Sequence, residues 1–305
     1  MYHGIINVYK EKGFSTHDVV AKLRGICKQK KIGHTGTLDP DAEGVLPVCL
    51  GKATKLCETM TDKDKTYEAC LRLGVSTDTQ DMTGNIIAQS EVEVSSQEVR
   101  DAIHSFLGEY DQIPPMYSAL KVNGKKLYEY AREGIIIERK PRRVTIYSIE
   151  ITRIELPLVW FQVECSKGTY IRALCQDIGD KLGCGGAMES LKRTRVSSFK
   201  IKDSLTLSQI EELQNQGCLQ QHLFSLDEMF RGWQTGVVKA EYEKFLYNGN
   251  QLYLHQFETK VKIAQDLLVY DRKGNFIGVY QWNEEKGFFK PWKLFLPISE
   301  GEPLG

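Results

Sequence analysis

Two successive segments with alternating apolar and polar residues place the strongest limit on how this chain can fold. RVTIYSIEI covers residues 143–151, and LVWFQVEC covers residues 158–165. Alternation with a period of two is typical of strands that bury one face and expose the other. The residues IELP between them suffice for a turn, so the pair predicts a half-buried antiparallel hairpin.

Further segments predict a mixed α/β domain around this hairpin. Strands are expected at residues 4–10 and 66–75, where apolar, β-branched and aromatic residues gather. Helices are expected where capping residues precede amphipathic stretches. They are a helix from Thr16 to Cys27 with Thr16 as its cap, one opened by Ser95 and Glu98 and stopped at Gly108, one ended by Gly134, one within residues 168–183 closed by Gly183, and one from the capping pair Thr206 and Gln209 to about Gln214.

The character of the chain changes at about residue 232. Downstream, short strand candidates such as KIAQDLLVYD and FIGVYQW are separated by the turn signals NGN and DRKGN, without a long helical pattern. A chain of 305 residues is long enough for one large and one small domain. We therefore expect a mixed α/β domain over residues 1–232 and a small all-β domain over residues 233–305.

Basic residues are unevenly distributed, although 40 Lys and Arg residues balance 40 Asp and Glu residues. Between Lys121 and Arg143 there are eight basic residues and three Glu. A second basic run ends at Lys31, and a third extends from Lys192 to Lys202. One run is usually a solvated face, whereas three runs, two of them with aromatic residues, suit a surface that follows a polyanion. Charge alone leaves both interpretations open.

Cysteine and apolar patterns narrow the class of protein. The eight cysteines contain no Cys-x-x-Cys pair, and no His pair has zinc spacing. Thiols in a reducing cytoplasm are therefore expected, rather than disulfides or a metal site. The first residues, MYHGIINVYK, show no signal-peptide pattern, and no apolar run is long enough to cross a bilayer. These patterns predict a cytoplasmic protein without membrane association.

Several common enzyme motifs do not fit the sequence. GKAT at residues 51–54 ends like a phosphate-binding P-loop, but Leu46 stands where that motif needs glycine. DTQDMTGN at residues 78–85 is acidic, but Gln80 stands where a calcium-binding loop needs a carboxylate or Asn. No G-x-S-x-G elbow marks a serine hydrolase. Phosphotransfer, calcium and serine-hydrolase chemistry are therefore disfavoured.

One carboxylate, Asp39, lies in a restrained stretch, GHTGTLDPDAEGVLPVCLGKATK, at residues 33–55. Its glycines permit backbone conformations closed to other residues, and Pro40 keeps Asp39 out of the helical region. A solvated turn is the plain alternative. His34 is either a structural histidine, or a base or metal ligand. An ionised carboxylate can act as nucleophile or base without a metal, which suits an isomerisation.

The same stretch resembles the catalytic signature of the TruB-type tRNA pseudouridine synthases, which isomerise the uridine at tRNA position 55. Other segments extend the resemblance over most of residues 1–230, and the tail resembles a PUA RNA-binding domain more loosely. The supporting segments are DKTYEACLRLGVSTDTQDMTG (64–84), IPPMYSALKVNGKKLYEYAREG (113–134), CSKGTYIRALCQDIGDKLGCGG (165–186) and LKRTRVSSF (191–199). The resemblance implies a pseudouridine synthase fold, with a mixed, largely antiparallel central sheet flanked by helices.

The resemblance also implies roles for single residues. Asp39 matches the catalytic aspartate, and Arg172 matches the arginine that pairs with it and keeps it ionised. Tyr67 matches the tyrosine that stacks on the flipped base and is a candidate for proton removal at C5. An insertion at about residues 113–143 is expected to close over the T arm of the tRNA. The implied substrate-binding residues are His34, Tyr170, Leu191, Lys125, Lys126, Arg142 and Arg143.

The resemblance implies no metal, no organic cofactor and no obligatory protein partner. Two alternatives stay open, namely a guide-RNA-dependent pseudouridine synthase and a tRNA-binding or folding protein without catalysis. The expected insertion favours an enzyme that works alone, and the presence of Asp39, Tyr67 and Arg172 together favours catalysis. One departure concerns the N-terminus, where the family usually has Lys-Pro before a glycine and this chain has Lys10-Glu11-Lys12-Gly13.

Overall fold

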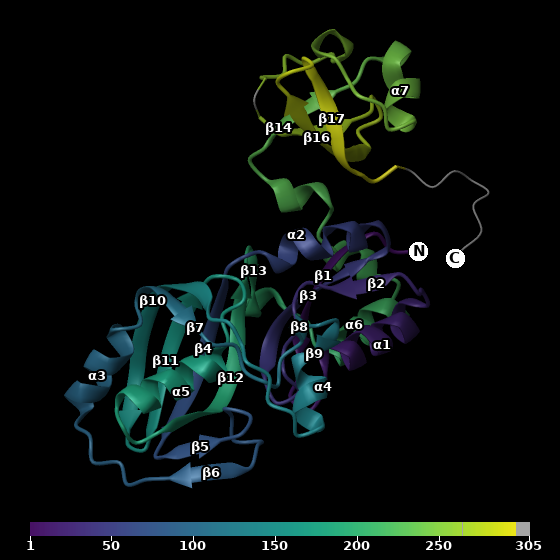
Figure 1. Cartoon of the computed structure of the whole chain (residues 1–305). Helices are drawn as coiled ribbons and strands as arrows, with labels where there is room; N and C mark the ends of the chain where they lie inside the picture. Colours follow the sequence, from purple (N-terminus) through teal and green to yellow (C-terminus); the bar gives the residue numbers. More distant parts are fainter. Residues whose placement is uncertain (264, 297–305) are drawn as a thin grey trace.

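The computed structural model describes residues 1–263 and 265–296. A large part contains the main sheet, and a smaller β part follows it at the C-terminal side of the chain (Figure 1). The described residues of the large part form a nine-stranded sheet in the order β1-β3-β12-β4-β11-β10-β7, with β2 paired to β3 and β13 paired to β12. Its strands are β1 Gly4–Lys10, β2 Ile32–His34, β3 Glu43–Leu50, β4 Lys65–Leu73, β7 Gly108–Gln112, β10 Arg142–Glu155, β11 Leu158–Cys165, β12 Gly186–Val196 and β13 Phe199–Lys200.

The main sheet is mixed, because β12 pairs with β3 in parallel and its other described pairs are antiparallel. This arrangement confirms the predicted fold class. The β10–β11 hairpin is also present, but β10 extends to Glu155, so that Ile154 and Glu155 lie in the strand instead of the turn. The alternating pattern stops earlier because register shifts interrupt the pairing of the two strands.

Helices pack against one face of the main sheet in each of its two halves. Short helices connect its strands (Figure 1). The α-helices of the large part are α1 Thr16–Cys27, α2 Cys57–Thr61, α3 Ser96–His104, α4 Leu127–Arg132, α5 Ile171–Lys181 and α6 Leu207–Asn215, and α7 Glu243–Tyr247 belongs to the smaller part. The 3-10 helices are η1 Gly51–Leu56, η2 Ile201–Asp203, η3 Leu219–His222, η4 Asp227–Phe230, η5 Ala240–Tyr242 and η6 Leu254–Gln256. Side chains of α1 pack with β1 and β3, whereas side chains of α5 pack with β4 and β11.

The predicted cap of α1 is wrong by one residue. Ser15 is the N-cap, since its hydroxyl accepts from the Asp18 amide and its own amide donates to the Asp18 carboxylate. Thr16 is buried instead, and its hydroxyl donates to the Leu38 carbonyl and accepts from the Leu38 amide. Thr16 therefore ties α1 to the residue next to Asp39. The helix opened by Ser95 also ends earlier than predicted, at His104.

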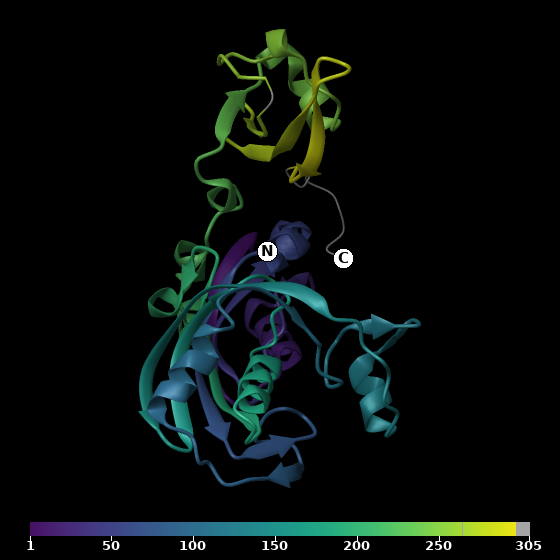
Figure 2. The same cartoon turned by 60° about the vertical axis from the view of Figure 1, so that its left-hand side comes forward.

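Two small hairpins extend from the main sheet. One consists of β5 Val75–Thr77 and β6 Ile86–Gln89, and the other of β8 Lys121–Val122 and β9 Lys125–Lys126. Figure 2 shows the second hairpin and α4 as an arm that projects from the main sheet. The expected insertion at about residues 113–143 contains this arm.

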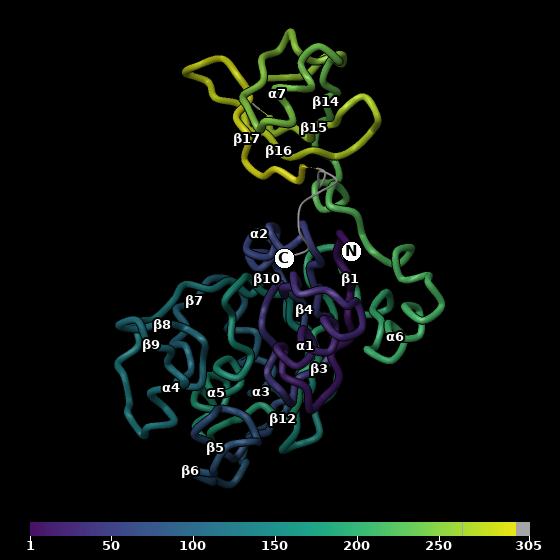
Figure 3. Tube along the Cα trace, turned by 90° about the vertical axis from the view of Figure 1, so that its right-hand side faces the viewer, coloured from purple at the N-terminus to yellow at the C-terminus, as the bar shows by residue number. Residues whose placement is uncertain are grey.

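The smaller part is a four-stranded sheet in the order β14-β15-β16-β17 within the described residues. It contains β14 Gln234–Val237, β15 Leu267–Tyr270, β16 Phe276–Asn283 and β17 Phe288–Leu294. Figure 3 shows it beyond α2 and the N-terminal strand. Leu268, Val279 and Phe295 share a buried cluster with Phe199 and Phe230, so apolar packing joins the two parts.

Candidate active site

Asp39 lies in the loop between β2 and β3, which the fold holds against β12. The neighbouring Leu38 is buried, whereas the Asp39 side chain keeps 40% of its surface exposed. Gly44 has a φ of 108°, and a Cβ there would lie 2.2 Å from the Arg193 carbonyl oxygen. Only glycine fits such a conformation and approach. The loop therefore buries its apolar residue and leaves its carboxylate accessible.

Arg193 holds both sides of the Asp39 loop from the inside. It is only 1% exposed, and its guanidinium donates to the carbonyls of Gly36 and Thr37 at 3.3 Å each and of Val45 at 2.7 Å. Two neighbouring basic residues of the same run are also paired. Lys192 pairs with Glu43 and Arg195 pairs with Glu164, whereas Lys200 and Lys202 at the end of the run are exposed. A charge count along the sequence does not reveal such partners.

Lys10 supports the other side of the loop, although the family's proline is missing after it. Its buried ammonium donates to the carbonyls of Phe14 at 2.6 Å, Pro40 at 3.0 Å and Glu11 at 3.2 Å. Gly13 donates its amide to the same Pro40 oxygen at 2.9 Å. Burial lowers the pKa of Lys10 to about 8. A lysine thus fixes the peptide that follows Asp39.

Arg172, at the start of α5, joins two carboxylates. Its Nε lies 3.0 Å from Asp39 Oδ2, and its Nη1 lies 3.4 Å from Asp81 Oδ2. The guanidinium also donates to the carbonyls of Thr79 at 3.1 Å and Tyr117 at 3.0 Å. Arg172 is 6% exposed, so these contacts determine where its charge lies. The expected pair of Asp39 and Arg172 is present.

Asp81 is a site residue that sequence reasoning missed. Its Oδ1 accepts from the Thr79 hydroxyl at 2.7 Å, the Thr83 hydroxyl at 2.6 Å and the Thr83 amide at 3.1 Å. It lies in DTQDMTGN, a segment whose acidity suggests only a calcium loop. Thr79 and Thr83 on either side of Asp81 are the sequence feature that could have indicated its burial, because nearby hydroxyls commonly donate hydrogen bonds to a buried carboxylate.

Different neighbours of Asp39 raise and lower its pKa. Loss of solvent raises the pKa of Asp39 above its ordinary value, the Arg172 guanidinium opposes that rise, and Asp81 adds to it. Because Arg172 lies in direct contact and the carboxylate is not enclosed, the buried guanidinium fixes the orientation of an accessible carboxylate. The pKa of Asp39 therefore departs from the ordinary value expected from the sequence.

Tyr67 and Leu191 form the apolar side of this site. Tyr67 in β4 lies opposite Arg193 in β12, and Leu191 lies opposite Ala69. Tyr67, Leu191 and Leu38 belong to one buried cluster. Burial raises the pKa of Tyr67 to about 12, while the neighbouring Arg193 opposes the rise. The Tyr67 hydroxyl is thus protonated at neutral pH, and its candidacy as the base at C5 stays a prediction.

His34 and Tyr170 flank the site from different elements. His34 ends β2, its Nδ1 accepts from the Gly36 amide at 3.3 Å, and its ring meets His17 edge to face at 5.7 Å. Burial lowers the pKa of His34 below its ordinary value, so its ring is neutral at pH 7. Tyr170 precedes α5, where its amide donates to Gln112 Oε1 at 2.8 Å.

The four predicted basic contacts fall into two groups. Lys125 and Lys126 lie on the arm, where Lys125 pairs with Glu133 and lies 4.7 Å from the Tyr130 ring centroid, and Lys126 lies 5.3 Å from that of Tyr128. Arg142 and Arg143 lie instead at the start of β10, and Arg143 pairs with Glu109 and Asp111. These side chains are not part of the Asp39 site itself.

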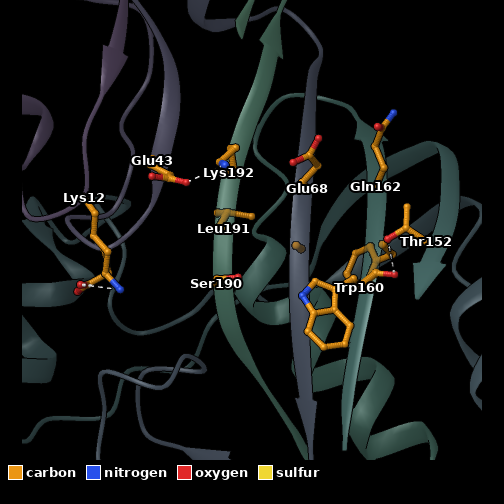
Figure 4. Close-up of a pocket in the computed structure, with 12 residues that line it drawn as sticks. Lys12, Glu43, Glu68, Thr152, Trp160, Gln162, Ser190, Leu191 and Lys192 are labelled. Carbon is orange, nitrogen blue, oxygen red and sulfur yellow. Dashed lines mark hydrogen bonds and ion pairs between the residues drawn. The ribbon is translucent and has the colours of Figure 1, made fainter. Parts of the chain in front are cut away.

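A cavity of about 490 Å³ lies over β4, β11 and β12, and Leu191 and Asp41 from the Asp39 region are among the residues that line it (Figure 4). Glu68, Trp160 and Lys192 line it. Since Glu68 follows Tyr67 in β4, the two side chains point to opposite faces. We place the chemistry at Asp39, because the Figure 4 cavity lacks the Arg172–Asp39 pair.

Neither a metal cluster nor a membrane span occurs in residues 1–263 and 265–296. No group of three or more His, Cys, Asp and Glu residues there could hold a metal ion. Within the same described ranges, no helix is both long and apolar enough to span a membrane.

Matches to known families cover residues 24–231, a range that includes the Asp39 loop. Residues 24–171 match the TruB family pseudouridylate synthase N-terminal domain, and residues 172–231 match the tRNA pseudouridylate synthase B C-terminal domain. The chain belongs to the TruB family. The predicted resemblance is therefore confirmed.

Relatives that align over nearly the full chain support this membership, and solved structures share the fold. A tRNA pseudouridine synthase B of Lachnoclostridium phytofermentans is 54% identical and aligns over 96% of this chain and 100% of the relative. One from Alkaliphilus oremlandii is 47% identical, over 90% and 92%. A chain from the crystal structure of a Cbf5-Nop10-Gar1 complex superposes with a TM-score of 0.73 at 25% identity, covering 97% of this chain and 85% of that chain. A chain from an H/ACA RNP bound to a substrate RNA containing 2'-deoxyuridine has a TM-score of 0.71 at 23% identity, over 99% and 88%, and shares the fold.

Proposed function

We propose that this protein isomerises the uridine at position 55 in the T loop of tRNA to pseudouridine. Membership in the TruB family, with relatives named tRNA pseudouridine synthase B at 44–54% identity, supports the reaction and the substrate. The single structural observation that carries the proposal is the accessible Asp39 carboxylate held 3.0 Å from the buried Arg172 guanidinium. The isomerisation needs one such carboxylate and no external electron or group donor.

Before the reaction, the target uridine must be flipped out of the stacked bases of the T loop. Flipping the uridine out of the T loop costs about a few kcal/mol, which contacts in the cleft offset. Asp39 then assists cleavage of the C1′–N1 bond, the uracil rotates, and C5 joins C1′. The C5 proton leaves and N1 gains a proton, so atoms and electrons balance. Three starting roles for Asp39 remain compatible with this scheme, namely attack at C6, attack at C1′ and removal of a sugar proton.

The other site residues position the base. The Tyr67 ring and Leu191 offer an apolar wall for the uracil, and the protonated Tyr67 hydroxyl serves as a hydrogen-bond donor. His34, which is neutral, occupies space beside the vacated position in the T loop. Tyr170 and the basic residues Lys125, Lys126, Arg142 and Arg143 contact the T arm.

We also propose a division of labour along the chain. Residues 1–232 carry catalysis, with the insertion at about residues 113–143 over the T arm, and residues 233–305 form a PUA-like domain that binds a more distant part of the tRNA. The protein works without an obligatory protein partner. A cytoplasmic location agrees with its eight free cysteines.

A guide-RNA-dependent enzyme is the alternative within the same fold. Chains with this fold from the Cbf5-containing complexes and the H/ACA RNP are 23–25% identical, whereas the relatives named tRNA pseudouridine synthase B are about twice as similar. The arm of β8, β9 and α4 further favours direct binding of tRNA.

A direct test uses the protein alone with an unmodified tRNA transcript, followed by mapping of pseudouridine. We expect conversion at position 55 without guide RNA or partner protein. Conversion only after a guide RNA is added would support the alternative, and binding without conversion would support a tRNA-binding protein.

A further inference from the structure

A group of lysines gathers where the large and small parts of the molecule meet. Lys31 directly precedes β2, Lys52 and Lys55 lie in η1, and Lys293 lies in β17. These four residues, called the junction cluster below, come from segments separated by up to about 260 residues of chain. The cluster is not part of the Asp39 site or of the arm.

Reciprocal hydrogen bonds draw two of these cations together. Lys55 Nζ donates to the Leu294 carbonyl at 2.7 Å, and Lys293 Nζ donates to the Lys55 carbonyl at 2.8 Å. Each lysine therefore reaches across the junction toward the backbone beside the other. The contacts fix the two ammonium groups at the boundary between η1 and β17.

The junction cluster has no carboxylate to balance it in the described part of the chain. None of its four lysines makes an ion pair within residues 1–263 and 265–296. Burial lowers the pKa of Lys55, and the charges of Lys31 and Lys293 lower it further. The pKa of Lys52 is lowered by burial and by the charge of Lys55. Mutual repulsion of this kind favours a bound polyanion.

An exposed aromatic surface adjoins the cluster. Trp292 is 40% exposed, and its ring centroid lies 5.0 Å from Lys293 Nζ. Its ring meets Phe230 edge to face at 6.3 Å, and Phe230 in turn contacts Trp233, which is 38% exposed. Lysines beside exposed indole rings suit RNA, because the cations pair with phosphates while the rings can stack on sugars or bases.

We propose that the junction cluster and Trp292 form a second RNA-binding surface, which holds phosphates of the substrate tRNA outside its T arm. The proposal rests on the proposed tRNA function. β2 connects Lys31 at one of its ends to His34 at the other, a span of about 10 Å at roughly 3.3 Å per residue. The surface therefore lies close enough to the Asp39 site for one RNA molecule to contact both, and it continues onto the small C-terminal sheet.

The test compares two RNAs with the full chain. In a variant with Lys31→Gln, Lys52→Gln and Lys55→Gln, affinity for a full-length tRNA transcript should fall about tenfold or more at low salt, and the log–log salt slope should fall by up to about three units. Affinity for an isolated T-arm stem-loop should stay within about twofold. A matched variant with Lys63→Gln, Arg100→Gln and Lys181→Gln removes the same charge elsewhere and should bind both RNAs normally.

Unchanged affinity of the junction variant for full-length tRNA would overturn the proposal. Equal loss for the stem-loop would also overturn it, because the cluster would then belong to the T-arm site. A variant with the same three lysines changed to arginine separates charge from domain docking. It should retain tRNA affinity, and a loss equal to that of the glutamine variant would assign the lysines to docking. Conversion of uridine by the wild-type protein tests the proposed function separately from these affinities.

Discussion

Two basic stretches of similar composition have opposite structural roles. In the stretch that begins at Lys192, Arg193 is 1% exposed and its neighbours Lys192 and Arg195 pair with carboxylates. In the arm, Lys125 and Lys126 lie beside tyrosine rings. Arg193 holds the Asp39 loop through three carbonyls, whereas Lys125 and Lys126 are the residues that we propose to contact RNA. A run of Lys and Arg thus indicates a polyanion surface only if its side chains are free to reach solvent.

The two basic stretches also differ in what they contribute to the stability of the fold and to RNA affinity. Arg193 lies in the interior and donates to three loop carbonyls, so its replacement leaves buried acceptors unsatisfied. Exposed cations near a surface contribute little to stability but much to association with phosphates. Substitutions in the β12 stretch should therefore change catalysis and stability, whereas substitutions in the insertion should change RNA affinity and its salt dependence.

The largest of these effects is expected for Arg193→Lys. Lysine keeps the charge but cannot reach all three carbonyls, so the Asp39 loop shifts, and a misplacement of about 1 Å can cost on the order of 100-fold in kcat. The free energy of unfolding should fall by about 2 kcal/mol, measured by denaturant titration. RNA affinity should stay near the wild-type value.

Arg195→Lys on the same strand is the matched control, since Arg195 pairs with the half-exposed Glu164. Its kcat should stay within about a few-fold of wild type. Equal effects of the two substitutions would contradict the special role of Arg193.

A smaller effect is expected from neutralising Lys125, Lys126, Arg142 and Arg143 together. Affinity for full-length tRNA and for the T-arm stem-loop should both fall, by about tenfold or more, and the salt slope should decrease by up to about one unit for each phosphate that is no longer bound. The unfolding free energy should change little. Binding isotherms of both RNAs at several salt concentrations measure the affinities and the salt slopes. Weaker binding of only one RNA would contradict the assignment of these four residues to the T arm.

The effect of Tyr67→Phe should be smaller again. The ring still stacks on the base, but the hydroxyl beside Arg193 is removed, so kcat should fall by about tenfold with affinity unchanged. Single-turnover rates and equilibrium binding separate the two quantities. A normal rate would show that the hydroxyl has no essential part in the reaction.

The least change is expected on removal of metal. EDTA should leave the rate unaltered once folding of the tRNA in magnesium has been controlled for, because the proposed reaction requires neither a redox step nor a metal-bound nucleophile. Activity that returned only with one specific metal would contradict this prediction.

Prediction from sequence succeeded where a local pattern or a family motif determined the outcome. Alternation predicted the β10–β11 hairpin, and the motifs around Asp39 and Arg172 predicted their contact. Asp81, by contrast, is linked to Arg172 across 91 residues of chain, so its role depends on tertiary packing. The burial of Arg193 is likewise invisible in the sequence, because any Arg in a basic run has the same local signature.

The cap of α1 shows that the exact start of a helix is harder to predict from sequence than the helix itself. Ser15 and Thr16 are both good N-cap residues, and local chemistry does not choose between them. The tertiary contact of Thr16 with Leu38 decides the outcome, since it gives the Thr16 hydroxyl a buried partner. Boundaries of this kind follow from the packed structure.

The most direct test of the account is the Asp39→Asn variant, compared with wild type for pseudouridine formation and for tRNA affinity. The amide nearly preserves the shape of the side chain but removes the charge that Arg172 holds in place. We predict no detectable isomerisation, with tRNA affinity within a few-fold of wild type, because binding depends mainly on phosphate contacts elsewhere. Isomerisation by Asp39→Asn at a rate near that of wild type would contradict the assignment of Asp39 as the catalytic carboxylate.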